Sequence, residues 1–120
     1  MRDRIYLCLA HMSGEEQKFI KEAFDTNWVV PLGPNVNGFE ADLEAFVGCG
    51  KKVVALSAGT AALHLALIAC GVKAGDEVLC QSFTFCASAN PITYLGAKPI
   101  FIDSEVDTWN MDPELLEKAI

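Results

Sequence analysis

The pattern of apolar and polar positions predicts two helices in the first part of the chain. The first lies within residues 13–27, where Ser13 and Glu16 have the spacing of a capping box. The second is expected to be capped by Asn35 or Asn37. Apolar residues at helical spacing define one face of each helix: Phe19, Ile20, Ala23 and Phe24 in the first, and Phe39, Leu43, Phe46 and Val47 in the second.

Residues 53–71 predict a strand, a tight turn and a third helix. The apolar run of residues 53–56 is rich in valine and fits a strand covered on both faces. Gly59 allows the turn, and helix-forming residues continue from Thr60 to Gly71, a residue suited to follow a helix end. A helix that starts beyond the C-terminal end of a strand points free N–H groups at the crevice above the sheet, where an anion such as phosphate binds. The same pattern also fits an ordinary strand-to-helix turn capped by Thr60.

The rest of the chain continues this alternation. Strands are expected at 77–81 and 99–103, a helix opens within 82–90 and is kinked or restarted by Pro91, and Asp112 caps a last helix. The order is helix, helix, then strands and helices in alternation, which is typical of an α/β chain with a parallel sheet. No linker or repeat interrupts residues 1–120, so a single domain with no internal boundary is expected.

Composition and charge restrict the class of protein. The chain has 120 residues, 52% of them apolar, and a net charge of −7, which argues against nucleic acid or an anionic membrane as main partners. No apolar run is long enough to span a bilayer and no signal peptide opens the chain, so a cytoplasmic location is expected. Five cysteines without a Cys-x-x-Cys pair or Cys/His cluster argue against a zinc site or disulfide framework, and Cys70, Cys80 and Cys86 are expected to pack as small hydrophobes.

Two predicted helix starts, at Gly59-Thr60 and at Thr84-Phe85, open on the same edge of the expected sheet. A phosphate site beside an aromatic side chain fits a phosphorylated aromatic cofactor such as pyridoxal phosphate, and it also fits a mononucleotide. The alternative is that Phe83 and Phe85 are core residues. His64 lies in an apolar helix, which favours a packing role over a catalytic one.

Residues 28–34 form an apolar loop with two prolines and a glycine. A loop of this kind must be covered by another subunit, a later part of the chain or a ligand, or by its own domain.

Several segments, in this order and at this spacing, resemble the DegT/DnrJ/EryC1/StrS family of pyridoxal-phosphate aminotransferases, which act on nucleotide-linked keto-sugars. The segments that carry the resemblance are 27–34, 57–67, 75–78, 84–90, 96–103 and 110–117. It implies the N-terminal part of a type I aminotransferase large domain, a three-layer α/β/α fold with a mostly parallel sheet. It further implies glutamate as amino donor, a homodimer, and a role in making sugars of cell-surface polysaccharides or secondary metabolites.

The resemblance also implies roles for individual residues. Gly59, Thr60 and Ala61 would bind the cofactor phosphate, and Phe85 would stack on the pyridine ring. Trp28, Leu32 and Gly33 would lie near the sugar nucleotide or a neighbouring subunit. Gln81 stands where many relatives have proline, which leaves the shape of that turn open.

Transamination requires a lysine that bonds covalently to the cofactor. The lysines that precede the expected strands (Lys51, Lys52, Lys73 and Lys98) fall at the edge of the sheet opposite the cofactor, and the helical lysines (Lys18, Lys21 and Lys118) are no better placed. We therefore expect no catalytic residue within 1–120, the front portion of a longer enzyme, and no activity of these residues alone. In the implied topology strand 53–57 lacks a neighbour within 1–120, so it would be unfolded, re-paired or completed by another chain.

Three alternatives remain open. A dehydratase of the same family replaces the lysine by histidine, at a position outside this sequence. A non-catalytic α/β module for a phosphate or nucleotide ligand belongs to another class of protein. The third is a truncated product without function.

Overall fold

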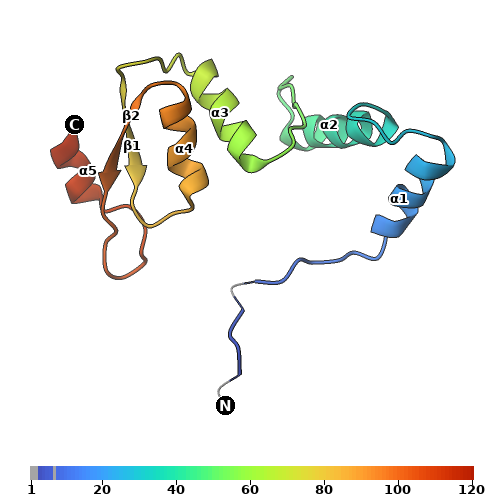
Figure 1. Ribbon diagram of the computed structural model, residues 1–120, viewed down its shortest axis with the longest axis horizontal. Coiled ribbons are helices and arrows are strands. Elements are labelled where there is room, and N and C mark those ends of the chain that lie inside the picture. Colours follow the sequence, from blue (N-terminus) through green and yellow to red (C-terminus); the bar gives the residue numbers. More distant parts are fainter. Residues whose placement is uncertain (1–2, 7) are drawn as a thin grey trace. The chain divides into compact units, whose positions relative to one another are not determined.

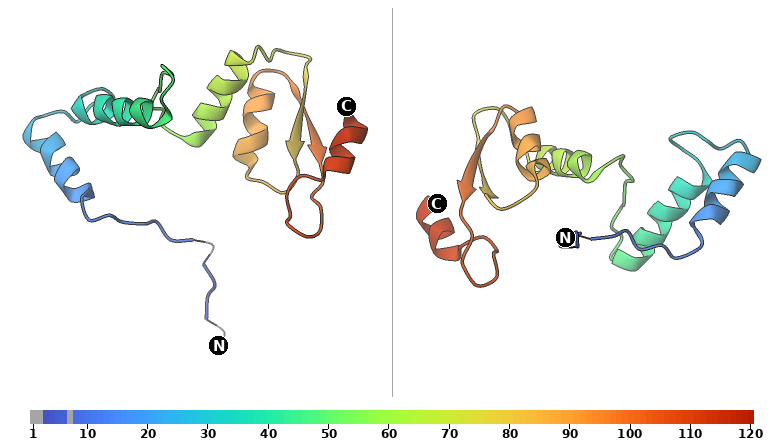
Figure 2. Two further views of the ribbon diagram at one scale, coloured as in Figure 1. Left: turned by 180° about the vertical axis from the view of Figure 1, so that it is seen from behind. Right: turned by 60° about the horizontal axis from the view of Figure 1, so that its bottom comes forward.

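The computed structural model describes residues 3–6 and 8–120. The elements are α1 (Glu16–Asp25), α2 (Pro34–Val47), α3 (Gly59–Ala69), β1 (Glu77–Gln81), α4 (Cys86–Tyr94), β2 (Lys98–Ile102) and α5 (Pro113–Ala119). They group into two compact units, which we call unit 1 (Met1–Ala55) and unit 2 (Leu56–Ile120). Figure 1 labels the elements along the chain, and Figure 2 shows each unit from two further directions.

Unit 2 contains the sheet and the core. Strands β1 and β2 pair in parallel, with Glu77 opposite Lys98 and Gln81 opposite Ile102, which confirms the predicted parallel arrangement. Helix α4 connects the two strands and α3 packs against α4. The buried cluster of unit 2 is small, and the residues that form it or pack against it are Cys80, Ile92, Ala97, Leu67, Val72, Val78 and Ala89.

Helices α3 and α4 end in the same way. Gly71 follows α3 and Gly96 follows α4, with φ angles of 81° and 71° in the left-handed region. In each case three backbone N–H groups beyond the helix donate back to its last turn, for example Val72 N to Leu67 O and Ala97 N to Ile92 O. The closing residues Val72 and Ala97 thereby reach the core, so the sequence prediction that Gly71 follows the end of α3 is confirmed.

Unit 1 holds α1 and α2, and none of its described residues is buried. The carboxylate of Glu16 accepts the Ser13 N–H at 2.6 Å and the Ser13 hydroxyl at 2.9 Å, but the reverse capping bond is absent and Glu15 is the N-cap. The prediction that Asn35 or Asn37 caps the second helix is wrong. Helix α2 begins at Pro34, because proline has no N–H to satisfy in the first turn and its fixed φ suits that position.

The predicted strand at residues 53–57 is also wrong, because no part of this segment is a strand in the structure. No other strand of unit 1 is present among the described residues, so a backbone ladder has no partner to form with. Instead, Val53 N donates to Glu44 Oε1 at 3.1 Å, and Ala55 N donates to Glu40 Oε1 at 2.8 Å. Side chains of α2 thus take the place of a neighbouring strand.

The remaining sequence predictions fall close to the structure. Strand β2 begins one residue earlier than expected, and Asp112 caps α5 by accepting the N–H groups of Glu114 and Leu115. Of the cysteines expected to pack in apolar surroundings, Cys80 is buried, whereas Cys70 and Cys86 are exposed. No helix in the described part of the chain is both long enough and apolar enough to cross a membrane.

Candidate functional site

The N-terminus of α3 offers a group of backbone donors. Ala58 is the N-cap in an extended conformation, and the first helical bond runs from Ala62 N to Ala58 O at 3.1 Å. No side chain caps this end. The N–H groups of Gly59, Thr60 and Ala61 therefore point beyond the helix without an acceptor among the described residues, which is the arrangement that binds phosphate groups.

Gly59 is not required by the backbone of this chain. Its φ lies outside the left-handed region, and a Cβ added there would meet no atom within 4 Å. The sequence predicted that the turn at residue 59 needs the conformational freedom of glycine, but the backbone there would accept alanine. The absence of a side chain matters only to a molecule that approaches the helix end from outside, so this position fits a bound phosphate.

Phe85 stands at the start of α4. The helix opens at Cys86, within the predicted range of 82–90, and Phe85 is its extended N-cap. Two hydrogen bonds hold the turn before it. Ser82 N donates to Ile102 O at 2.8 Å, and the hydroxyl groups of Thr84 and Ser88 bond to each other at 2.8 Å. Phe85 is 75% exposed and Phe83 65% exposed, so the alternative that these rings belong to the core is wrong for this chain.

The start of α4 lies at the carboxyl edge of the strands. In Figure 1, β1 and β2 run downward and α4 runs upward, so α4 begins toward the carboxyl ends of the strands, whereas α3 slants and lies across the strands in the right-hand view of Figure 2. This is the edge at which ligands of α/β proteins bind. Phe85, the N-cap of α4, lies at this edge. That Gly59, Thr60 and Ala61 share a site with Phe85 remains a prediction, as do the roles of all four residues toward a cofactor.

Lys98 lies at the other edge. Its Nζ is 2.9 Å from Glu77 Oε1, at the amino ends of the paired strands, where both side chains are exposed. Lys73 precedes the same end of β1 in the turn closed by Asp76, whose Oδ2 accepts the Lys73 N–H at 2.9 Å. For these two residues the placement agrees with the sequence prediction that they face away from the cofactor edge.

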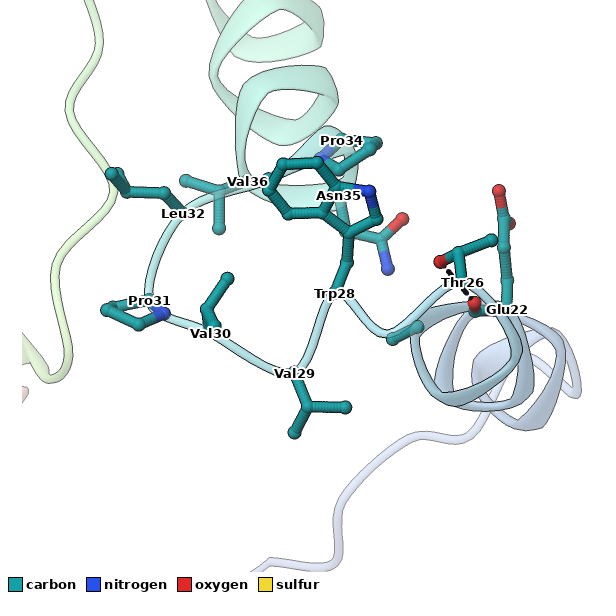
Figure 3. Close-up of a pocket in the computed structure, with 12 residues that line it drawn as sticks. Glu22, Thr26, Trp28, Val29, Val30, Pro31, Leu32, Pro34, Asn35 and Val36 are labelled. Carbon is teal, nitrogen blue, oxygen red and sulfur yellow. Dashed lines mark hydrogen bonds between the residues drawn. The ribbon is translucent and has the colours of Figure 1, made fainter.

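In unit 1, the three predicted substrate residues line a single pocket of about 530 Å³ (Figure 3). Trp28 is brought there by the end of α1, where Asn27 adopts a left-handed φ of 60° and Trp28 N donates to Ala23 O. Gly33 has a φ of 137°, and a Cβ on it would lie 3.0 Å from the Trp28 ring. The pocket is lined by Glu22, Ala23, Thr26, Trp28, Val29, Val30, Pro31, Leu32, Gly33, Pro34, Asn35 and Val36.

A polar network that the sequence did not predict joins the end of β1 to the loop after β2. Gln81 Nε2 donates to Ser104 Oγ at 3.1 Å and to the carbonyl of Trp109 at 2.6 Å, which fixes the loop that follows β2. The Phe83 and Trp109 rings meet at 5.5 Å between centroids. The one available signal was Gln81 itself, a residue with a long amide at the position where many relatives have proline.

His64 makes an edge-to-face contact with Tyr94, with 5.5 Å between ring centroids. It is half-buried between α3 and α4. This contact supports the packing role that the sequence favoured.

Solved structures resemble this chain in fold. The chain superposes on a sugar aminotransferase, Spr1654 from Streptococcus pneumoniae in its PMP form, with a TM-score of 0.75 and 39% identity, over 84% of this chain and 26% of that one. It also superposes on a GDP-4-keto-6-deoxy-D-mannose-3-dehydratase of Escherichia coli with bound hydrated PLP, with a TM-score of 0.81 and 25% identity, over 95% of this chain and 30% of that one. These likenesses define the class of protein. The chain forms part of the type I aminotransferase fold, whose solved members here bind pyridoxal phosphate or its amine form.

The family follows from the sequence itself. Residues 10–120 match the model of the DegT/DnrJ/EryC1/StrS aminotransferase family, and the chain belongs to that family. It is 58% identical to EpsN of Bacillus subtilis, named for pyridoxal phosphate-dependent aminotransferase activity, over all of this chain and 31% of that protein. It is 39% identical to a GDP-perosamine synthase of Caulobacter vibrioides, over 98% of this chain and 31% of that protein. The chain thus spans about a third of the length of these relatives.

Proposed function

We propose that this chain serves as the corresponding part of a pyridoxal-phosphate aminotransferase that transfers an amino group from glutamate to a nucleotide-linked keto-sugar. The relatives named GDP-perosamine synthase support a nucleotide-sugar substrate. The product would be an amino sugar for cell-surface polysaccharide or secondary-metabolite synthesis. The enzyme would be a cytoplasmic homodimer, and residues 1–120 alone would be inactive.

The observation that carries this proposal is the open start of α3. Three N–H groups without acceptors, at Gly59, Thr60 and Ala61, can hold the cofactor phosphate, and the helix dipole favours its negative charge. The Thr60 hydroxyl can add one donor. Phe85, exposed at the start of α4, can cover the flat ring of the cofactor.

When bound, pyridoxal phosphate supplies the electron sink on which amino-group transfer depends. The residues of this chain hold and orient it: the α3 backbone fixes the phosphate, and the Phe85 ring excludes water from one face of the pyridine. Trp28, Leu32 and Gly33 would bind the sugar nucleotide, since Figure 3 shows the indole of Trp28 beside the open pocket. The lysine that bonds to the cofactor would come from outside residues 1–120.

The phosphate site is tested on the full-length protein by spectral titration with pyridoxal phosphate. Thr60→Val removes one hydroxyl donor to a charged group and is expected to raise the Kd about 10-fold or more. Phe85→Ala is expected to raise it about 2- to 10-fold, through lost ring contact. Thr93→Val is the control, because the Thr93 hydroxyl donates only to Asn90 O within α4. Equal affinity in Thr60→Val and the control would contradict the phosphate assignment.

Gly59→Ala is the sharpest variant. Because an added Cβ meets open space in the chain, the free energy of unfolding should stay the same or rise by up to about 1 kcal/mol. The same methyl group should obstruct a phosphate at the helix end and weaken cofactor binding. Unchanged binding together with unchanged stability would show that the phosphate is held elsewhere.

A second candidate reaction is supported by the likeness to the dehydratase. The two activities differ in whether nitrogen from glutamate is transferred to the sugar. Incubation of the full-length protein with a GDP-linked 4-keto-sugar and labelled glutamate is expected to give an aminated sugar. Loss of water without transfer of nitrogen would instead establish the dehydratase.

A further inference from the structure

The segment that leads from α2 toward α3 has one edge bonded and one edge open. Val53 N and Ala55 N donate to carboxylates of α2, Glu44 at 3.1 Å and Glu40 at 2.8 Å. Among the described residues, the N–H of Val54 has no acceptor. Alternate residues of an extended chain direct their N–H groups to opposite edges. The two carboxylates therefore lie along a single edge.

The spacing of the helix matches the spacing of the extended chain. Glu40 and Glu44 are four residues apart on α2, a rise of about 6 Å along the axis. Val53 and Ala55 are two residues apart in the segment, about 6.6 Å in an extended chain. The bonds run antiparallel, with the later carboxylate on the earlier amide, because the chain reverses after Gly48. Two contacts of this kind fit without distortion of either element.

Charge reinforces the arrangement. A carboxylate accepts an N–H more strongly than a neutral carbonyl does. Glu44 also pairs with Lys52, with 2.9 Å between Nζ and Oε2, and its side chain is only 27% exposed. A strand that approached this edge would have to displace both carboxylates from the N–H groups of Val53 and Ala55, which opposes pairing there.

We propose that Glu40 and Glu44 close one edge of residues 53–55 against strand pairing, so that the segment accepts a neighbouring strand only through the edge of Val54. This is a device against wrong pairing of an exposed apolar segment. Such segments with free edges otherwise associate with other chains, and native proteins commonly block them with charged groups. Here the charges come from an adjacent helix instead of the strand itself.

Hydrogen exchange of the wild-type chain gives a first test that needs no variant. The amides of Val53 and Ala55 are expected to exchange at least 10-fold more slowly than the amide of Val54, corrected for intrinsic rates. Exchange of the Val53 and Ala55 amides at their intrinsic, unprotected rates would overturn the proposal.

Single variants give a second test with a built-in cross-check. Glu40→Ala should release Ala55 first and Glu44→Ala should release Val53 first, each by about the full protection seen in the wild type. Asp42→Ala is the matched control, since it removes one carboxylate from the same helix at a residue with no hydrogen bond to the segment. Glu40→Gln keeps an acceptor oxygen and should restore most of the protection at Ala55. If Glu40→Ala and Asp42→Ala lowered the protection of Ala55 equally, the loss would come from general destabilisation of α2 and not from the bond to Glu40. That result would overturn the proposal.

Self-association is the functional readout. Sedimentation of Glu40→Ala/Glu44→Ala is expected to show concentration-dependent oligomers at concentrations at which Asp42→Ala matches the wild type. The double variant could sediment as the wild type does while its Val53 and Ala55 amides exchange freely. That result would show that the carboxylates do not prevent pairing at this edge.

Discussion

Two apolar runs of this chain, 53–57 and 77–81, lead to different structures. Each precedes a helix whose N-terminus is a candidate ligand site. Residues 77–81 form β1, because β2 lies beside them in the same unit. Residues 53–57 form no strand, and Val54 is 63% exposed. An apolar run rich in β-branched residues can therefore pair as a strand. It forms a strand only where a partner completes its backbone hydrogen bonds.

The two units also differ in what stabilises them. Unit 2 is organised around buried apolar side chains, with Ile92 only 2% exposed. The described residues of unit 1 include no buried side chain, and polar side chains join its segments: Glu40 and Glu44 bind residues 53–55, and Asn35 donates to Phe19 O.

Ile92→Ala should destabilise unit 2 by about 2–5 kcal/mol, because it removes most of a fully buried side chain and leaves a cavity. Hydrogen exchange at β1 and β2 amides should accelerate strongly. The amides of Val53 and Ala55 should keep their wild-type rates, because their acceptors belong to unit 1. If amides of both units lost their protection from exchange together, the two units would unfold as one cooperative structure, which would contradict the contrast between them.

Proline substitution applies the same change to both apolar runs. The ladder ends at Ser82 N to Ile102 O, so the N–H of Cys80, two residues earlier, also faces β2. Cys80→Pro should therefore cost about 1–3 kcal/mol for the carbonyl left without a donor, in addition to steric conflict. Val54→Pro removes an N–H that has no acceptor and should change stability little. Denaturant unfolding measures both, and equal losses would mean that residues 53–57 are also paired.

Two glycine-to-alanine changes separate backbone strain from helix propensity. Gly96 has a φ of 71°, and a Cβ there would lie 3.0 Å from Ala74 Cβ, so Gly96→Ala should destabilise unit 2 by about 1–2 kcal/mol. Gly38 lies within α2 with open space around it, so Gly38→Ala should stabilise unit 1 by up to about 1 kcal/mol. Thermal unfolding followed by residue-resolved NMR distinguishes the units. Opposite signs are expected, and a shared sign would contradict the assignment of strain to Gly96 alone.

Acid should affect the start of α1. Hydrogen bonds from its own backbone N–H, and from the N–H and hydroxyl of Ser13, lower the pKa of Glu16 to about 2. Because the pKa in the folded chain lies below the ordinary value, the stabilisation is complete above about pH 4.5 and is lost as the pH falls toward 2. Carbon-detected NMR titration of Glu16 should show this midpoint, with the Ser13 amide shift following it. A midpoint near 4.5 would mean that the Ser13 bonds are not formed in solution.

Much of the fold was predictable because its signals are local. Asp112 followed by Pro113 specifies a helix start, and Gly71 and Gly96 specify turns that only glycine adopts easily. The pairing of β1 with β2 follows from the short helix between them, since a strand, a helix and a strand return in parallel. These features depend on neighbours in sequence.

The errors had two causes, a missing partner for an expected strand and a proline beside the expected helix caps. Residues 53–57 satisfied every local rule for a strand, and only the absence of a partner made the prediction wrong. Pro34 displaced the expected caps Asn35 and Asn37, because a proline in the first turn outweighs a polar side chain one residue later. For the candidate site, the open start of α3 was visible in the sequence. The bonds from Gln81 to Ser104 and Trp109 were not, because they join residues more than twenty positions apart.

The pairing of α2 with residues 53–55 has a geometric limit. Helix and extended chain advance at unequal rates, about 6 Å against about 6.6 Å per contact, and the helix face also rotates about 40° over each four residues. A third contact would already be out of step in both distance and direction. The flanking positions on the same helical row, Val36 and Gly48, accordingly carry no acceptor side chain. Side chains of a straight helix can thus bond the edge of an extended segment at two positions. A longer segment would need a second helix to occupy the rest of its edge.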